Sequence, residues 1–375
     1  MRLLFFSDLH LEAPFRWAPP DVARERRRAL RECLSTIVAL AAAQRVDALV
    51  CAGDLYEHDR YTPDTAQFVR DCFARLHPMP VYVAPGNHDW FGPASLYQRV
   101  DWTPNVHVFP DDRLTPVTLA DGLTLWGAAH RAPADTRGFL TDFRVDRGGV
   151  HLGLFHGSEQ GALAFQEDDK VPHAPFRAEQ IGAAGLHHAL VGHFHTPRDA
   201  ADHTYPGNPE PLTFGETGGT GASGEPIGRG AVLVTVDDTG AVARERHRVA
   251  VSQVSDVVVD LDGITHGTQV QSTVDAALAD VKGTVRVTLR GELHPDVEFD
   301  PGDLRRPVHI DAWVVRAGAV TYAYDLDALA QEQTVRGQFV RDVRAATELA
   351  EDDRRRVLVT GLRAFERRRN DLEVR

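Results

Sequence analysis

The sequence has few cysteines and almost no lysine. Its 375 residues include three cysteines, Cys33, Cys51 and Cys72, and no two of them form a C-x-x-C pair. An odd number without such a pair excludes a disulfide framework and a thiolate zinc knuckle, and it suits a reducing compartment. Lysine occurs only at Lys170 and Lys282. Any contact with phosphate would therefore use the planar guanidinium group of arginine.

Long hydrophobic runs and an excess of basic charge are also absent. The apolar run Leu3–Phe6 near the start of the chain is too short for a signal peptide. No uncharged apolar run approaches the roughly 20 residues that cross a bilayer. We therefore expect a soluble, cytoplasmic protein without a membrane partner. The 41 basic and 54 acidic residues give a formal net charge of −13, which argues against a purely electrostatic nucleic-acid binder.

Short apolar runs alternate with amphipathic stretches through the first part of the chain. This pattern predicts mixed β-sheets covered by helices, which is an α/β fold. The predicted helices are Ala23–Gln44 and a second one from Pro63 to about Leu76. The predicted strands are Leu3–Phe6, Ala48–Cys51, Val81–Ala84, Val106–Phe109, Val117–Leu119, Leu123–Trp126, Val150–Phe155, Ala189–Val191, Ala231–Val236 and Val242–Val249.

The character of the sequence changes around Ser252–Ser255. Beyond that point a small α+β unit is predicted, with strands at Val257–Leu261, Val285–Leu289 and His309–Val315 and a helix over Val270–Val281. From residue 325 onward the pattern is helical and strongly charged. We therefore predict a first domain over residues 1–250, a second over 251–324 and a helical C-terminal region over 325–375.

Polar motifs follow five of the predicted strands. They are Asp8-Leu9-His10, Gly53-Asp54, Gly86-Asn87-His88-Asp89, His156-Gly157 and Gly192-His193-Phe194-His195. Because residues i and i+2 of an extended chain point the same way, Asp8 and His10 can aim two ligands at one point. The same holds for His193 and His195. Polar side chains on loops at strand ends are where catalytic groups usually lie.

These motifs supply oxygen and nitrogen ligands for metal ions, without a thiolate. The candidate ligands are Asp8, His10, Asp54, Asn87, His156, His193 and His195. Such a mixed set suits Mn, Fe, Zn or Co, and it is too large for one tetrahedral site. Two ions roughly 3.5–4 Å apart clamp a phosphate and lower the pKa of bound water to about 7. His88, next to a ligand, is the candidate to protonate the leaving oxygen.

In this order, the segments SDLH, AGDL, GNHD, FHG and VGHFH resemble the motifs of the calcineurin-like metallophosphoesterase superfamily. The resemblance implies a four-layer fold of two facing mixed β-sheets flanked by helices, here with a small α+β C-terminal cap domain and a helical tail. It also implies a role for each candidate. One metal would be held by Asp8, His10 and His195, a second by Asn87, His156 and His193, with Asp54 bridging the two and His88 as the acid.

A closer resemblance lies in the segment Tyr205–Glu216, YPGNPEPLTFGE, which is similar to YPGSPERLSFGE of the SbcD family. Within the YPGSPER part of that pattern, this chain has Asn208 and Pro211 in place of the serine and the arginine. The opening DLHLEAPF and the later Glu332–Val340, EQTVRGQFV, resemble a YhaO-like bacterial branch of the family. Some members have a histidine three residues after the bridging aspartate, where this chain has Glu57.

The SbcD resemblance implies a DNA exonuclease and endonuclease in repair or recombination. The expected cofactors are two divalent ions, Mn²⁺ first, with Fe, Zn, Co or Mg as the other candidates. The expected partners are DNA, an SbcC-like coiled-coil ABC-type ATPase and a second copy of the chain, in the cytoplasm at the nucleoid. Residues 251–324 would contact DNA and 325–375 would dock the ATPase. Two alternatives stay open, a phosphodiesterase or phosphatase for nucleotides and other small phosphoesters, and a mainly DNA-binding scaffold subunit.

Three side chains are predicted DNA contacts. Arg26 and Arg27 belong to a run of basic residues that could face backbone phosphates or form the solvated face of the first helix. Trp90 follows the GNHD motif and could stack on a base or pack beneath its loop. The acidity of the chain predicts weak, salt-sensitive DNA binding without a partner.

Overall fold

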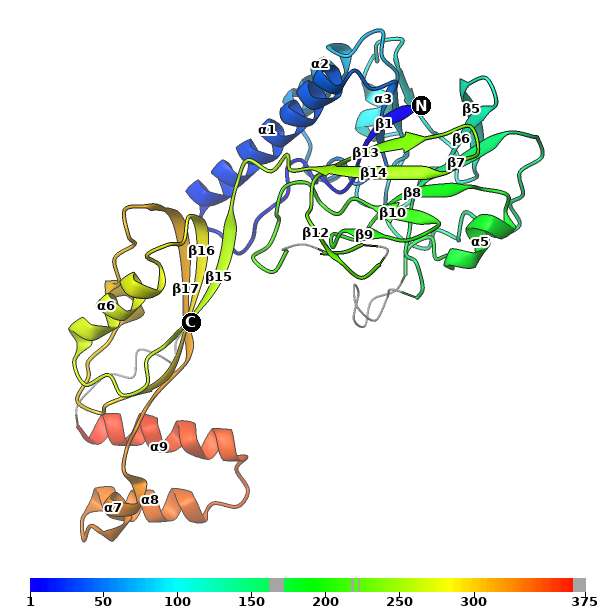
Figure 1. The fold of residues 1–375 in the computed structure, drawn as a ribbon. Helices are drawn as coiled ribbons and strands as arrows, with labels where there is room; N and C mark the ends of the chain where they lie inside the picture. The colour runs from blue at the N-terminus through cyan, green and yellow to red at the C-terminus, as the bar shows by residue number, and fades with distance from the viewer. Residues whose placement is uncertain (162–171, 217–218, 222, 367–375) are drawn as a thin grey trace. The chain divides into compact units, whose positions relative to one another are not determined.

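The structure is a computed structural model that describes residues 1–161, 172–216, 219–221 and 223–366. The chain divides into two compact units, Met1–Ser252 and Gln253–Arg375, which are drawn in Figure 1. Residues 367–375, the end of the predicted helical region, lie outside the described part. The three-part division of the chain and the roles given to its parts stay predictions.

The first unit contains a six-stranded sheet in the order β14-β13-β1-β2-β3-β4. Its strands are β1 (Arg2–Phe6), β2 (Ala48–Cys51), β3 (Val81–Val83), β4 (Val106–Val108), β13 (Ala231–Val236) and β14 (Val242–His247). β1 to β4 pair in parallel, whereas β13 is antiparallel to both of its neighbours. The carboxyl ends of β1, β2 and β3 therefore meet at one edge of the sheet.

A second sheet of eight strands has the order β12-β11-β9-β10-β8-β7-β6-β5. Its strands are β5 (Thr115–Ala120), β6 (Leu123–Gly127), β7 (Val150–His156), β8 (His188–Gly192), β9 (Arg198–Asp199), β10 (His203–Tyr205), β11 (Gly219–Thr220) and β12 (Pro226–Ile227). β6, β7 and β8 are parallel. The sequence analysis missed β9 to β12, because strands of two or three residues are too short to show an alternating pattern.

Among its described residues, the helices of the first unit are α1 (Pro20–Gln44), α2 (Pro63–Ala74), α3 (Leu96–Arg99) and α5 (Ala178–Ala183). α1 begins three residues before its predicted start, because proline is favoured in the first turn of a helix, where its missing N–H is not needed. Pro63 opens α2 in the same way, and the side chain of Thr62 caps it. Among the described residues, none of the helices combines the length and the apolar character that crossing a membrane requires.

Alternating residues of β1 show how the layers of the first unit pack. Leu4 and Phe6 are buried against α1 and α2, whereas Leu3 and Phe5 are buried against the second sheet. On the far face of the second sheet, residues such as Val191 pack with α5. The first unit thus has helices, two facing mixed sheets and a further helical layer, visible in Figure 1. This confirms the predicted four-layer α/β fold.

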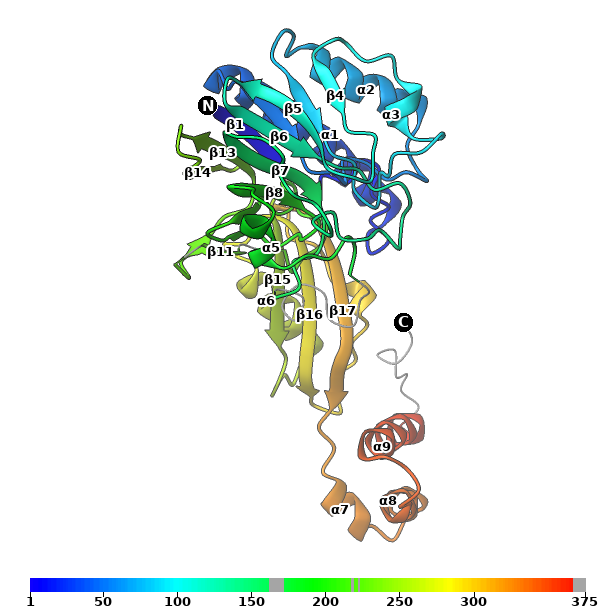
Figure 2. The same cartoon turned by 90° about the vertical axis from the view of Figure 1, so that its right-hand side faces the viewer.

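The second unit is a small α+β domain followed by helices. Its sheet consists of three parallel strands, β15 (Val254–Asp260), β16 (Gly283–Leu293) and β17 (Ile310–Tyr322). Figure 2 shows this sheet with α6 (Gly267–Ala277) beside it, and the helix contributes Val270 and Val274 to the shared core. The described part of the unit also contains a short 3₁₀ turn, Pro301–Asp303, and the helices α7 (Leu326–Gln331), α8 (Val335–Ala345) and α9 (Glu351–Phe365).

Candidate metal centre

The seven predicted ligands lie together at the carboxyl ends of parallel strands in the first unit. In one sheet, a predicted ligand follows the end of each of the strands β1, β2 and β3. In the other sheet, a predicted ligand lies at the end of β7 and another follows β8. In chain order the residues are Asp8, His10, Asp54, Asn87, His156, His193 and His195. Two groups of three among them have ligand atoms that all lie within 4.8 Å of one another.

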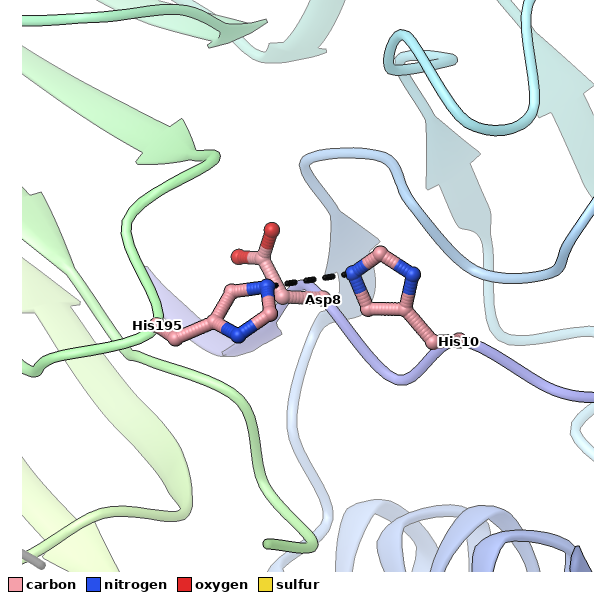
Figure 3. Close-up of side chains that lie close together, drawn as sticks. All are labelled: Asp8, His10 and His195. Carbon is pink, nitrogen blue, oxygen red and sulfur yellow. Dashed lines mark hydrogen bonds between the residues drawn. The ribbon is translucent and has the colours of Figure 1, made fainter. Parts of the chain in front are cut away.

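The first group consists of Asp8, His10 and His195, drawn in Figure 3. One nitrogen of each imidazole ring points at the other ring, with Nε2 of His10 3.2 Å from Nε2 of His195, and the Asp8 carboxylate lies beside them. Asp8 and His10 are almost fully buried. Two ring nitrogens directed at each other next to a buried carboxylate form a set of donors that suits a cation.

The second group consists of Asp54, His156 and His193. Nε2 of His156 lies 3.2 Å from Nδ1 of His193 and 3.0 Å from the side-chain oxygen of Asn87. The amide oxygen of Asn87 therefore lies beside this group, where the family resemblance would place a ligand of the second metal. Its donors are again only oxygen and nitrogen, which fits a second divalent ion.

Asp54 lies between the two groups. Its Oδ2 is 3.2 Å from Nε2 of His156 and 3.7 Å from Nε2 of His10, so one oxygen faces both sites. Burial acts to raise the pKa of Asp54, but the charges of His156, His88 and His10 outweigh it and hold that pKa well below its ordinary value. An ionised carboxylate in this place is what a bridging metal ligand requires. The residues present thus fit two divalent ions, although they do not select one metal.

The backbone at the site is strained in a way that no sequence motif showed. Asp8, His10, Asp54 and His193 all have positive φ angles, 56°, 51°, 50° and 113°, although none is glycine. Each such conformation costs of the order of 1–3 kcal/mol and persists only where the surrounding structure enforces it. Here the Asp8 N–H donates to the carbonyl of Gly53 and the His10 N–H donates to that of Asp54. The two loops therefore hold each other in the strained conformation.

Asp89 is a functional residue whose role the sequence analysis missed, although it is the last letter of the GNHD motif. Its carboxylate is fully buried and accepts hydrogen bonds from the backbone N–H groups of Gly86 at 2.6 Å, Asp54 at 3.0 Å and Leu55 at 2.7 Å. The Tyr97 hydroxyl donates a fourth, at 2.5 Å. Asp89 thus ties the loop that carries Asn87 to the loop that carries Asp54.

Glu57 is a second missed residue, at the position where the family pattern can have histidine. Its Oε1 lies 2.8 Å from Nδ1 of His10, and its Oε2 lies 3.0 Å from Nδ1 of His88. Burial acts to raise the pKa of Glu57, but the hydrogen bonds from the two histidines lower it to about 2. Glu57 therefore remains a carboxylate that links a predicted metal ligand to the predicted acid.

His88 has the charge state that an acid needs. The charge of Asp54 and the contact with Glu57 outweigh burial and raise the pKa of His88 to about 10. Its side chain is 47% exposed, so a substrate can reach it. With Nδ1 facing Glu57, Nε2 is the nitrogen left to donate a proton. His88 also forms a third group of possible ligands with His10 and Glu57, so only metal measurements separate the two roles.

The predicted DNA contacts lie in different surroundings. Trp90 is half-buried, and His58 stacks on one face of its ring with the ring centres 3.7 Å apart. Arg27 is half-buried on α1. Arg26 is only 2% exposed, 3.1 Å from the buried carboxylate of Glu210, and it donates to the carbonyl of Pro211. A phosphate cannot reach Arg26 there, so its predicted role is wrong in this structure and its contacts are structural.

Replacing Arg26 tests this correction. Arg26→Met is expected to lower the free energy of unfolding by about 3–5 kcal/mol, because it leaves the buried Glu210 without its charge partner. Urea unfolding followed by circular dichroism measures the change. The matched control is Arg27→Met, next along the helix, for which we expect a change within about 0.5 kcal/mol. Unchanged stability in Arg26→Met, together with weaker DNA binding, would restore the original interpretation.

Two curated proteins are similar to this chain. The first is "Uncharacterized metallophosphoesterase YhaO" of Bacillus subtilis, 25% identical over 229 residues, which are 57% of this chain and 54% of that protein. The second is "DNA double-strand break repair protein Mre11" of Methanopyrus kandleri, 26% identical over 270 residues, 65% of this chain and 56% of that protein. The match thus spans about half the length of these relatives.

The chain is also similar to a solved structure and matches a known protein family. TT1561 of Thermus thermophilus covers 65% of this chain and 98% of its own, with 14% identity and a TM-score of 0.38, a similarity from which nothing follows about function. The family described as "Calcineurin-like phosphoesterase" matches residues 1–197, more than half of the 375 residues and the part that carries all seven candidate ligands. The chain belongs to the calcineurin-like phosphoesterase family, whose members are metal-dependent phosphoester hydrolases.

Proposed function

We propose that this chain is a two-metal phosphodiesterase that cuts DNA, the nuclease subunit of an SbcCD-like complex. The observation that carries the proposal is the position of Asp54, whose single oxygen Oδ2 faces both groups of metal donors. DNA as the substrate is supported by the segment Tyr205–Glu216 and by the similarity to a protein named for DNA double-strand break repair.

The chemistry divides between the ions and the protein. Two divalent ions, when bound, supply positive charge against the phosphate and lower the pKa of water to about 7. The protein's own part is to place donors and to move a proton. Asn87 directs its amide oxygen at the second group of ligands. The exposed His88 would donate a proton from Nε2 to the leaving 3′ oxygen of the cut strand, while Glu57 keeps Nδ1 occupied.

The partners belong to the same proposal. We take the ions to be Mn²⁺ and the partners to be DNA, a second copy of the chain and an SbcC-like coiled-coil ABC-type ATPase, at the nucleoid. Residues 251–324 would contact DNA, and the helices α7 to α9 would dock the ATPase. A net charge of −13 supports the dependence on a partner, because an acidic chain gains little affinity from phosphate contacts.

A small phosphoester is the second candidate substrate. Two observations favour it, the net charge of −13 and the burial of Arg26, which removes one of the predicted contacts with DNA. The metal centre and the acid His88 would serve a nucleotide or another small phosphoester equally well. The two candidates differ in substrate and share their chemistry.

An assay with Mn²⁺ separates them. End-labelled single- and double-stranded linear DNA would be incubated with the purified chain, beside bis-p-nitrophenyl phosphate, and each reaction would be repeated with His88→Ala. DNA degradation that disappears in the variant supports the nuclease. Hydrolysis of the small diester with intact DNA, in the presence of the ATPase as well as without it, would contradict the nuclease and favour the second candidate.

A further inference from the structure

A second carboxylate lies behind a predicted metal ligand, on the side away from the ion. Oε1 of Glu216 is 3.1 Å from Nδ1 of His195, whereas Nε2 of the same ring faces His10. An ionised carboxylate only accepts hydrogen bonds, so Nδ1 must carry the proton in this pair. Nε2 is then left with its lone pair directed toward the ion position, which is the form of imidazole that binds a metal.

The direction of the Glu216 side chain is itself fixed. Its other oxygen, Oε2, accepts hydrogen bonds from the N–H of Leu212 at 2.6 Å and from Nδ2 of Asn208 at 2.5 Å. The side chain is only 13% exposed. The N–H of Thr213 also donates to Oε2, at 3.3 Å. Because these three donors occupy Oε2, Oε1 is the oxygen available to His195, and the carboxylate cannot rotate without breaking these bonds.

Asn208 is oriented in turn by Arg229. The side-chain oxygen of Asn208 accepts a hydrogen bond from the Arg229 guanidinium, so its Nδ2 group must point the other way, toward Glu216. Asn208 is fully buried, and it stands where the similar SbcD segment has serine. The longer asparagine side chain offers an N–H₂ group and a carbonyl at once, which a hydroxyl does not.

The rest of the segment is anchored to the body of the first unit. Glu210, two residues after Asn208, is fully buried and 3.1 Å from Arg26. Its Oε2 accepts from the N–H of Val251 at 2.9 Å, and its carbonyl accepts from Nδ2 of Asn208 at 3.2 Å. The segment that presents Glu216 is thus held by contacts independent of His195.

We propose that Glu216 is a positioning residue for the metal centre, which orients His195 and selects Nε2 as its coordinating atom. A carboxylate that accepts from the outer nitrogen of a metal-bound histidine fixes the ring and makes it a stronger ligand. The inference rests on the proposed two-metal centre and not on DNA as the substrate. We expect Glu216 to strengthen the binding of only one of the two ions. In the other group, Nδ1 of His156 lies 2.8 Å from the backbone carbonyl of Ala52 and does not contact Glu216.

Binding of Mn²⁺ alone tests the proposal. In Glu216→Gln, Leu212 and Asn208 donate to the oxygen of the new amide, so the N–H₂ group of that amide faces Nδ1 of His195. Nδ1 must then accept a hydrogen bond, and the proton of the His195 ring is expected on Nε2. We expect calorimetric titration of the chelator-treated full chain to show one of two Mn²⁺ affinities weakened about 10–100-fold, with the other within threefold of the original. Asp256→Asn, which removes a carboxylate paired with Arg286 in the second unit, is the control and should match the unaltered protein.

A spectroscopic measurement separates positioning from a merely structural role. Long-range ¹H–¹⁵N correlation spectra of the metal-free chain report which ring nitrogen carries the proton, and His195→Gln identifies the signal. We expect Nδ1–H in the unaltered protein and Nε2–H in Glu216→Gln. Asn208→Ser, a milder change that leaves Glu216 in place, should weaken the same Mn²⁺ site by a smaller factor and serves if Glu216→Gln does not fold.

Several results would overturn the proposal. Unchanged Mn²⁺ affinities in folded Glu216→Gln would do so, as would an Nδ1–H tautomer of His195 in that variant, or unchanged affinities in Asn208→Ser if only that variant folds. The proposed function fails separately, since the binding measurements need no substrate. A chain whose Mn²⁺ affinity responds to Glu216 but which leaves DNA intact would retain this inference and lose the nuclease.

Discussion

Asp54→Ala is expected to leave the purified protein without a bound ion at either site and to lower phosphodiesterase activity by about 10³-fold or more. The reason is geometric, since Oδ2 of Asp54 is the oxygen that faces both His10 and His156. Without this oxygen, both sites lose the negative charge that they share. The loss of the ions removes several kcal/mol of transition-state stabilisation, and each 1.36 kcal/mol changes the rate by a factor of about ten.

The measurement for Asp54→Ala is metal content by mass spectrometry after equilibration with Mn²⁺ and desalting. Asp59→Ala is the matched control, because Asp59 is an exposed carboxylate in the same loop, and it should retain both ions. A thermal unfolding curve of the metal-free variant checks that it is folded. If folded Asp54→Ala retained two ions, the bridging role would be disproved, and retention of one ion would assign Asp54 to a single site.

His88→Ala is expected to lower kcat on DNA by about 10²–10⁴-fold, the range in which a positioned acid contributes, while metal content stays normal. The leaving oxygen of a DNA strand is strongly basic and needs a proton as the bond breaks. p-Nitrophenolate is a weak base that leaves without one. The loss on bis-p-nitrophenyl phosphate should therefore be much smaller than the loss on DNA, a difference that a general disturbance of the site would not produce.

Metal content decides between the two roles of His88. The residue forms a group with His10 and Glu57 that could hold an ion, yet the acid role requires that His88 does not. Asp89 is unsuitable as a control, since it holds the loop itself. His58→Ala, which removes an imidazole that stacks on Trp90, is the better one and should retain both activity and metal. An ion lost from His88→Ala would overturn the acid assignment.

The strands that position the site could be predicted because their pattern is local. In β1, Leu3 and Phe5 face one core while Leu4 and Phe6 face another, so four consecutive residues are apolar and stand out from their neighbours. Asp8 follows them after Ser7. A polar residue at the exit of a buried strand is visible in the sequence without any knowledge of its partners, and the same holds for Asp54 and Asn87.

The contacts of Arg26 could not be predicted in this way. Periodicity places Arg26 on a helix rich in arginine, where exposure to solvent or to phosphate is the ordinary expectation. Its partner Glu210 follows 184 positions later in the sequence. The sheet order brings them together, and no local pattern contains that information. The roles of Glu57 and Glu216 could not be predicted for the same reason. A contact between a carboxylate and the outer nitrogen of a histidine is recognisable only when the positions of both side chains are known.

The sequence by itself determined the α/β fold class, the buried strands and the kinds of donor atoms at their ends, because side-chain alternation and motif composition are properties of short segments. The resemblance of its motifs added the assignment of those donors to two metals. Only the tertiary structure decided which oxygen of Asp54 faces both groups, which nitrogens Glu57 and Glu216 occupy, and that Arg26 is buried. These depend on distances between side chains from different strands and loops, which the packing of two sheets creates.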